Sequence, residues 1–167
     1  MGVRQAPERA VFLIKNYVAD KMPQALIDIR ADRADPSANL EAIKKYYTNP
    51  VLNPLEFPSI FFLVQSIDYQ KASKQANYSS AKISMQVVGV VEDRTSDILT
   101  KKIWRYADCV QSILDNVGLI SENNKLKIIV YPERCTFSEV YGQKKDSSEA
   151  FRQEFTLDLT VECFENF

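Results

Sequence analysis

The closing stretch EFTLDLTVECF, Glu154–Phe164, alternates apolar and polar side chains over its whole length. Successive side chains of a β-strand point to opposite faces, so this alternation predicts a strand with one apolar and one polar face. The apolar face would carry Phe155, Leu157, Leu159, Val161 and Cys163. The polar face includes three carboxylates, Glu154, Asp158 and Glu162, whose role decides between a chemical site and a charged surface.

Strand geometry limits what these three carboxylates can do. Residues four apart on a strand are separated by about 13 Å, whereas the ligands of a calcium or magnesium ion lie about 2.0–2.6 Å from it. A glycosidase-type pair needs carboxylates about 5 to 9.5 Å apart, so a partner from another strand would be required. We therefore expect Glu154, Asp158 and Glu162 to provide surface charge, either facing a channel or pairing with Lys82 and its neighbours.

The elements before this strand alternate between strands and helices. Residues 59–69 and 78–92 are predicted as an antiparallel hairpin, since the polar segment 70–77 separates two runs of strand pattern. Apolar residues at helical spacing then predict a helix that Thr95 or Ser96 caps and Gly118 ends. Residues 126–131 are predicted as a strand that runs toward Tyr141, and 142–149 as a polar loop.

The N-terminal third is less regular. A helix is predicted from Glu8, and Pro23 is expected to kink or end it. Residues 25–34 fit either a second helical piece or a short strand. Residues 32–57 are predicted as an irregular connection containing one short helix. That helix would be capped by Ser37 or Asn39 and would carry Leu40, Ile43 and Tyr47.

The resulting order is helix, irregular connection, β-hairpin, helix and β-hairpin. It predicts an α+β fold with an antiparallel sheet of about four strands and helices packed on one face. A chain of 167 residues with 46% hydrophobic residues suits a single domain, residues 1–167. The sheet strand at residues 59–69 is apolar on both faces at its start, which predicts a central position or contact with another subunit.

Composition argues against most enzyme classes and against a membrane location. The chain has no histidine, which removes the usual general base, and it has neither a P-loop nor a G-x-G-x-x-G motif. Three cysteines without C-x-x-C spacing fit reduced thiols. The strongly apolar run Ile60–Val64 is far too short to span a bilayer. We expect a soluble, unsecreted protein that is not an enzyme and has no cofactor or metal.

Two charged segments have residue types that could form a binding site. Asp28, Asp32 and Asp35 lie among Arg30 and Arg33, but their spacing fails the calcium-loop pattern, so a solvated charged surface is the preferred interpretation. In the second segment, Lys44 and Lys45 precede Tyr46 and Tyr47, an arrangement that can stack on single-stranded bases. A net charge of −1 makes nucleic-acid binding the weaker alternative, and packing of the tyrosines in a core or a subunit contact is preferred.

The ordered elements resemble the tail terminator (tail completion) proteins of long-tailed bacteriophages over about Glu8 to Cys163. The resemblance is carried by five segments: ERAVFLIKNYV, FPSIFFLV, KISMQVVGVVED, ILTKKIWRYADCVQSIL and EFTLDLTVEC. The fourth segment, a helix with Leu99, Tyr106-Ala107 and Ile113-Leu114, directly follows the hairpin and is the most suggestive. The long connection between Asp32 and Phe57 departs from the compact members of the family.

The resemblance implies a virion protein, made in the host bacterial cytoplasm, that forms a ring, usually a hexamer. Such a ring caps the tail tube and joins it to the head connector, and DNA passes through it without sequence-specific binding. The interface expected on this basis comprises Tyr46, Tyr47, Ile60, Phe62, Lys144, Lys145 and Asp146, and the channel-facing residues are Glu154, Asp158 and Glu162. Two alternatives stay open: a small ligand-binding or regulatory α+β domain, and another neck or contractile-tail component.

Overall fold

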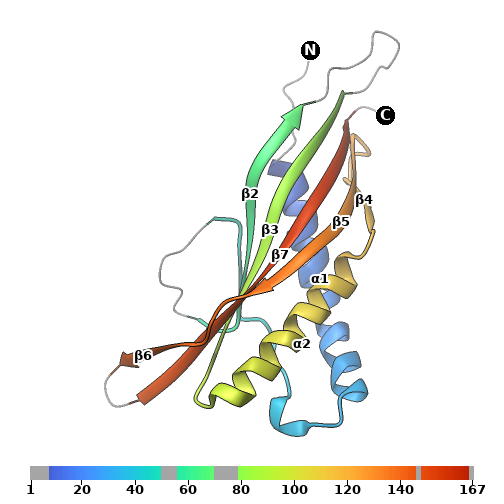
Figure 1. The fold of residues 1–167 in the computed structure, drawn as a ribbon. Coiled ribbons are helices and arrows are strands. Elements are labelled where there is room, and N and C mark those ends of the chain that lie inside the picture. The colour runs from blue at the N-terminus through green and yellow to red at the C-terminus, as the bar shows by residue number, and fades with distance from the viewer. Residues whose placement is uncertain (1–7, 50–55, 70–78, 146–147, 166–167) are drawn as a thin grey trace.

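Two helices pack against a strongly curved sheet in the computed structural model (Figure 1). The structure describes residues 8–49, 56–69, 79–145 and 148–165. The helical elements are α1 (Glu8–Asp32), the short 3₁₀ helix η1 (Pro36–Ala38) and α2 (Ser96–Leu114). The strands are β1 (Lys45–Tyr47), β2 (Ser59–Tyr69), β3 (Ser79–Asp93), β4 (Gly118–Ile120), β5 (Leu126–Phe137), β6 (Tyr141–Lys145) and β7 (Ser148–Glu165).

The sheet is built around β7, the strand that contains the alternating stretch. The order of the strands is β1-β2-β3-β7-β5-β4, and β6 also pairs with β7. β3 lies along one side of β7 for its entire length, while β5 and then β6 occupy the other side. All pairings are antiparallel except the short parallel contact between β1 and β2. The predicted hairpin of residues 59–69 and 78–92 is confirmed as β2 and β3.

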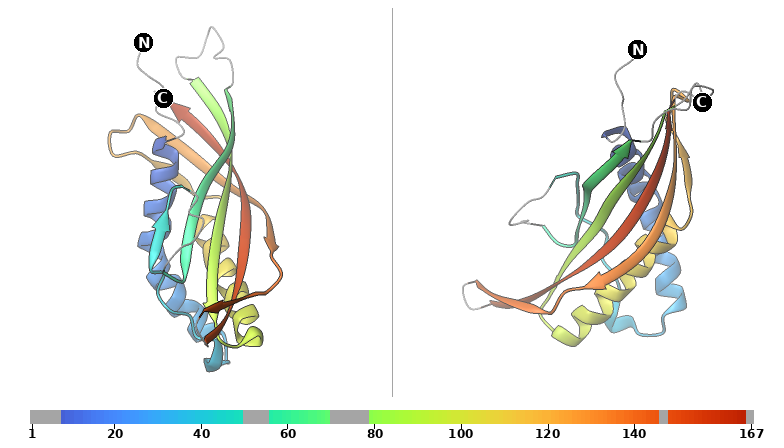
Figure 2. Two further views of the ribbon diagram at one scale, coloured as in Figure 1. Left: turned by 90° about the vertical axis from the view of Figure 1, so that its left-hand side faces the viewer. Right: turned by 45° about the horizontal axis from the view of Figure 1, so that its top comes forward.

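One face of the sheet forms the core with both helices (Figure 2). The alternation in β7 is confirmed, because Phe155, Leu157, Leu159, Val161 and Cys163 are all at most 2% exposed. Their neighbours on β3 and the buried sides of α1 and α2 belong to the same apolar cluster. The opposite face of β7 is only half-buried and carries the polar residues of the alternation. The expected α+β class with helices packed on the sheet is therefore observed.

The sheet has more strands than expected, with seven in the described part of the chain instead of about four. Three of the additional strands are short: β1 and β4 each have three residues, and β6 has five. Elements of this length contain too few residues to show a periodic pattern. β6 also replaces most of the polar loop that was predicted at 142–149, because its backbone pairs with the first residues of β7.

Helix α1 continues through Pro23 to Asp32, so it does not end at the proline, and the ambiguous segment 25–34 is largely helical. A proline inside a helix costs about 3 kcal/mol. Met22 and Leu26, on either side of Pro23, are both buried. Burial of two such side chains contributes about 1.5–3 kcal/mol each, which is enough to offset the proline.

The short helix expected near Leu40, Ile43 and Tyr47 is not formed. Residues 39–44 lie outside regular secondary structure, and Tyr47 belongs to β1. Asp35 caps η1, since its side chain accepts a hydrogen bond from the Ser37 backbone N–H. Helix α2 begins after Thr95 as predicted, but the Thr95 side chain makes no capping hydrogen bond. At its end Asn116, with a φ of 53°, and not Gly118 takes the left-handed conformation.

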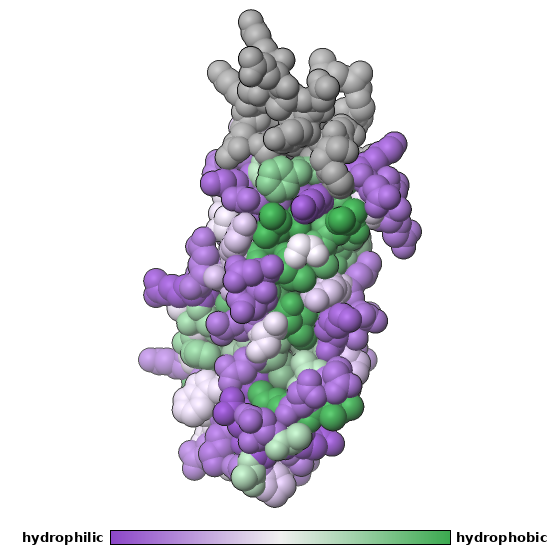
Figure 3. All heavy atoms as spheres, turned by 90° about the vertical axis from the view of Figure 1, so that its right-hand side faces the viewer, coloured by the Kyte–Doolittle hydropathy of each residue, from purple (hydrophilic) through white to green (hydrophobic). Residues whose placement is uncertain are grey.

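The side of the molecule formed by β4, β5 and the helices mixes apolar and charged surface. Hydrophobic side chains run in a narrow strip down this side, and hydrophilic side chains border the strip on both flanks (Figure 3). Ile120 of β4 and Trp104 of α2 are among the exposed large apolar residues, at 53% and 52%. A partner that covers such a surface must satisfy charges as well as bury apolar area.

Candidate assembly surfaces

The three carboxylates of β7 lie on the sheet face that no helix covers. Glu154, Asp158 and Glu162 alternate with the buried residues of the strand and are each half-buried between their neighbours. β3 and β5 flank them on the two sides. This placement follows from the period of two along a strand, which the sequence already indicated.

The carboxylates have polar or cationic neighbours across the strands. Lys82 of β3 lies directly opposite Glu162, and Arg134 of β5 lies opposite Asp158. The Nε2 amide of Gln86 donates to Oδ1 of Asp158 at 3.1 Å. The structure therefore places the acidic row beside Lys82. This position is the one that the expected pairing with Lys82 requires.

Glu154 lies at the end of the row nearest β6. Its Oε1 accepts a hydrogen bond of 3.2 Å from the Tyr141 hydroxyl. Burial, and then the nearby Glu154 carboxylate, raises the pKa of Tyr141, so this hydroxyl stays protonated and continues to donate at neutral pH. Within the described residues, no group of three His, Cys, Asp or Glu side chains is arranged to hold a metal ion.

Tyr46 and Tyr47 lie on β1 and pack against their own chain on opposite faces of the sheet. The ring of Tyr47 stacks on Phe61, with centroids 4.7 Å apart and an interplanar angle of 14°. The ring of Tyr46 stacks on Phe62 from the core side at 6.4 Å, and burial raises the pKa of Tyr46 to about 12. Both side chains remain partly exposed. The stack of Tyr47 on Phe61 explains why the start of β2 is apolar on both faces.

Ile60 and Phe62 are placed differently from the expected interface. Their side chains are 1% and 0% exposed and belong to the core beneath the helices. They have no surface with which to contact another subunit, which corrects the prediction for these two residues. β2 is also not central throughout, because β1 pairs only with residues 59–61 on its outer side.

The predicted interface loop is mainly a hairpin that projects from the body of the sheet (Figure 1). Lys144 and Lys145 belong to β6, and Lys145 pairs through its backbone with Ser148 of β7. Asp146 lies outside the described residues. The base of the hairpin is held firmly: Arg152 is buried, donates to Glu92 at 2.9 Å and lies over the Phe57 ring at 4.3 Å.

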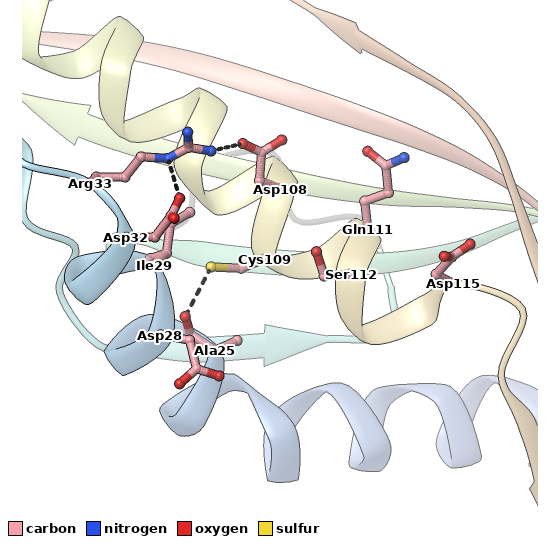
Figure 4. A pocket seen from close by; sticks show the side chains of 10 residues that line it. All are labelled: Ala25, Asp28, Ile29, Asp32, Arg33, Asp108, Cys109, Gln111, Ser112 and Asp115. Atoms are coloured by element: carbon pink, nitrogen blue, oxygen red, sulfur yellow. Dashed lines mark hydrogen bonds and ion pairs between the residues drawn. The ribbon is translucent and has the colours of Figure 1, made fainter.

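A groove of about 560 Å³ lies between the C-terminal halves of α1 and α2 (Figure 4). The residues that line each wall of the groove are mostly three or four positions apart, so they lie on one face of their helix. Ala25, Asp28, Ile29 and Asp32 come from α1, Arg33 directly follows it, and Asp108, Cys109, Gln111, Ser112 and Asp115 come from α2 or its C-cap. Four carboxylates thus face one guanidinium in this groove.

The charges of the groove are unevenly paired. Arg33 donates to Asp108 at 2.9 Å and also lies 3.7 Å from Asp32. Asp28 accepts from the Gln24 amide at 2.8 Å, and Asp115 from the Asn116 amide at 3.2 Å. Neither Asp28 nor Asp115 forms an ion pair with a described residue of the chain. Figure 4 shows Asp115 at the opposite end of the groove from Arg33.

Cys109 forms part of the groove floor, and the nearby charges of the groove affect the pKa of its thiol. Its thiol is 3% exposed and hydrogen bonds to the Ala25 carbonyl at 3.7 Å. Burial, followed by the Asp108 and Asp28 carboxylates, raises the pKa of Cys109 to about 12, and Arg33 opposes this rise. The thiol is therefore neutral and unreactive as a nucleophile near neutral pH.

Sequence reasoning treated Asp28, Asp32 and Arg33 as a solvated charged segment and did not connect them with α2. Each helix shows part of the pattern, as Asp28 and Asp32 four positions apart on α1 and Asp108 with Gln111 and Ser112 three and four positions later on α2, but the two helices come together only through their shared core. The pairing of Arg33 with Asp108, 75 positions later, could not be inferred from either segment alone.

Comparisons with known proteins identify no family for this chain. No protein-family model matches it, and no curated protein sequence matches it significantly. Among solved structures, a chain of "Virion of native gene transfer agent (GTA) particle" matches 87% of this chain and 97% of its own length at 16% identity, with a TM-score of 0.35. A TM-score this low does not establish a common fold. Neither helix of the described chain has an apolar stretch long enough to cross a membrane.

Proposed function

We propose that this chain is a structural subunit of a long-tailed bacteriophage virion and that it forms a ring, a hexamer as the resemblance implies, at the end of the tail tube. The ring would cap the tube and connect it to the head connector. The first support is the sequence resemblance to tail terminator proteins. The order of elements on which that resemblance depends is present in the structure as α1, the β2–β3 hairpin, α2 and the pairing of β5 with β7.

The observation that carries the proposal is the uncovered face of the sheet. Helices cover one face only, and the other bears a polar row along β7 that Lys82, Gln86 and Arg134 border. A protein ring that encloses DNA needs a hydrated surface toward its channel. A strongly basic lining would bind the DNA backbone, and an apolar lining would collapse. The acidic residues Glu154, Asp158 and Glu162 would repel phosphates from that surface.

Ring closure requires two different patches on each subunit, since a cyclic assembly of more than two copies uses a heterologous interface. The helices and the projecting hairpin offer such patches on different sides of the molecule (Figure 1). The alternative function, a small ligand-binding domain, requires a largely apolar pocket with a few converging polar groups. The groove between α1 and α2 is lined by four carboxylates and does not meet that description.

The proposal is tested by the assembly state of the purified protein. Light scattering and electron microscopy should show a closed ring, either in solution or on the ends of isolated tail tubes. Binding to tube walls is the internal control for binding to tube ends, so no separate control protein is needed. A protein that is monomeric in solution and also fails to bind tube ends would refute the proposed function.

A further inference from the structure

We propose that the connection between α1 and β2 holds the β6–β7 hairpin in place, through a contact between Phe57 of the connection and Arg152 of β7. Here "hairpin" means β6 with the part of β7 that pairs with it, and "connection" means the described residues between α1 and β2. The contact lies within one subunit, so it does not depend on the proposed ring.

The hairpin leaves the sheet as a two-stranded ribbon. β3 pairs with β7 only as far as Asp93, which lies opposite Phe151, and β5 pairs with β7 only from Phe155 onward. Toward the tip of the hairpin, the described part of the chain gives β7 only β6 as a partner (Figure 1). A two-stranded ribbon is marginally stable by itself in water, so contacts at its base decide whether it keeps its place.

The base of the ribbon is held on both faces of the sheet. On the core side, Phe151 and Val140 pack against the apolar cluster. On the other side, Arg152 is only 7% exposed, although no helix covers that face. Its Nε donates to Glu92 of β3 at 2.9 Å, and its guanidinium carbon lies 4.3 Å from the centre of the Phe57 ring. Phe57 is the contribution of the connection to this base.

Phe57 lies between two residues whose backbones are themselves held. The Ser59 hydroxyl donates a hydrogen bond to the Glu56 carbonyl. The Lys44 backbone N–H donates to the Pro58 carbonyl at 2.9 Å, which ties this end of the connection to the residue before β1. The Phe57 ring is therefore a supported surface against which the base of the hairpin can rest.

The chemistry of the contact suits a permanent attachment. A guanidinium over an aromatic face is attracted by the quadrupole of the ring, and the attraction is larger where water is excluded. Arg152 meets that condition because it is almost fully buried, and Glu92 balances its charge. A residue of the connection thus holds a hairpin that is formed much later in the chain.

Hydrogen exchange measured by mass spectrometry tests the contact through the variant Phe57→Leu, which keeps an apolar side chain but removes the ring. Peptides from the hairpin should exchange about tenfold faster than in the wild type, because local opening of the ribbon no longer breaks the contact with the ring. Peptides from α2 should exchange as before. Tyr47→Leu is the matched control: it removes another aromatic ring from the same face, one that stacks on Phe61 of β2, and should leave exchange in the hairpin unchanged.

A double-mutant cycle asks whether the two residues act through one contact. Arg152→Gln alone should also speed exchange in the hairpin, and adding Phe57→Leu to it should speed exchange no further, since the contact is already lost. Accelerations that multiply in the double variant would mean that the two residues act separately, which overturns the inference. If Arg152→Gln does not fold, the comparison of Phe57→Leu with Tyr47→Leu decides by itself.

Two further outcomes would overturn the inference. Wild-type exchange in the hairpin of Phe57→Leu would show that the hairpin is held without the connection. Equal acceleration in the hairpin and in α2 would show a general loss of stability instead of a local release. All variants are compared at one assembly state, checked by mass photometry, so contacts between subunits do not enter the comparison. A wild-type protein that forms no ring would refute the proposed function and would leave this test unaffected.

Discussion

At Gly89 the core of the sheet leaves no room for a side chain. It lies in β3 directly opposite Phe155 of β7, and the buried Phe155 ring covers it. A Cβ added at Gly89 would overlap the Cε1 and Cζ atoms of that ring. The Phe155 ring, and not the backbone conformation, therefore requires a glycine at this position, because Gly89 has no positive φ.

Gly89→Ala should lower the free energy of unfolding by about 1–3 kcal/mol, the usual cost of forcing an extra methyl group into a packed core. In a chain of this size each kcal/mol corresponds to about 2–4 °C in the melting temperature. Gly118→Ala is the matched control, since the nearest atom to its added Cβ would be the Ile128 carbonyl oxygen at 3.9 Å. Calorimetry that gives both variants the same melting temperature would mean that the Phe155 ring moves aside freely.

At the scale of elements, η1 is attached to α2 by one carboxylate. Asp35 accepts hydrogen bonds from the Ser37 side chain and backbone, and its Oδ2 lies 2.9 Å from Lys101 Nζ. The Ser37 hydroxyl, followed by Lys101, lowers the pKa of Asp35 to about 2. Arg105 adds to the attachment by donating to the carbonyls of Asp35 and Ala38, both at 3.0 Å.

The lowered pKa of Asp35 predicts how acid affects this attachment. A carboxyl group whose pKa is lower in the folded state stabilises the fold above its unfolded pKa, and that contribution disappears as pH falls through the folded pKa. Urea unfolding should therefore show Asp35→Asn as less stable than wild type at pH 5–7, and the gap should close between about pH 4 and pH 2. Asp20→Asn, at an exposed carboxylate 3.9 Å from Lys21, should show a smaller gap throughout. A gap for Asp35→Asn that is constant with pH would contradict the assignment.

The elements also show which parts of the fold the sequence could predict. β7 and α2 were predictable because each is long enough to display its own period, two in Glu154–Phe164 and 3.6 in α2. β1 was not, because its three residues pair with Ser59–Phe61 through a parallel contact that only the tertiary fold creates. The groove could not be predicted for the same reason. The sequence shows the polar residues of each helix, but whether they line one groove depends on how α1 and α2 pack.

The proposed ring predicts that the acidic row acts through the electrostatic potential of its channel. Glu154→Gln, Asp158→Asn and Glu162→Gln together should change the unfolding free energy by less than about 1 kcal/mol per site, since these groups are partly exposed. The triple variant should bind duplex DNA more tightly at low salt, and the gain should fade as salt rises. Fluorescence anisotropy at 50 and 200 mM salt, as nominal low and near-physiological conditions, measures both effects.

A second triple variant separates the row from net charge. Glu8→Gln, Asp97→Asn and Glu122→Gln remove the same number of exposed carboxylates from α1, α2 and the turn before β5. An equal rise in DNA affinity for both triple variants would assign the effect to total charge alone. Saturable binding of a divalent cation that only the first triple change abolishes would contradict the purely electrostatic role of the row.

The position of β7 in the sheet has a consequence for folding during synthesis on the ribosome. β7 follows every other described strand along the chain, yet it joins the two halves of the sheet. Until residues 148–165 have been synthesised, β3 has only β2 beside it, β5 has only β4, and β6 has no described partner. Such two-stranded pieces are marginal in water, so the sheet must close in one late step. If the protein assembles as proposed, subunits cannot begin to do so before that step, which keeps incomplete chains out of the assembly.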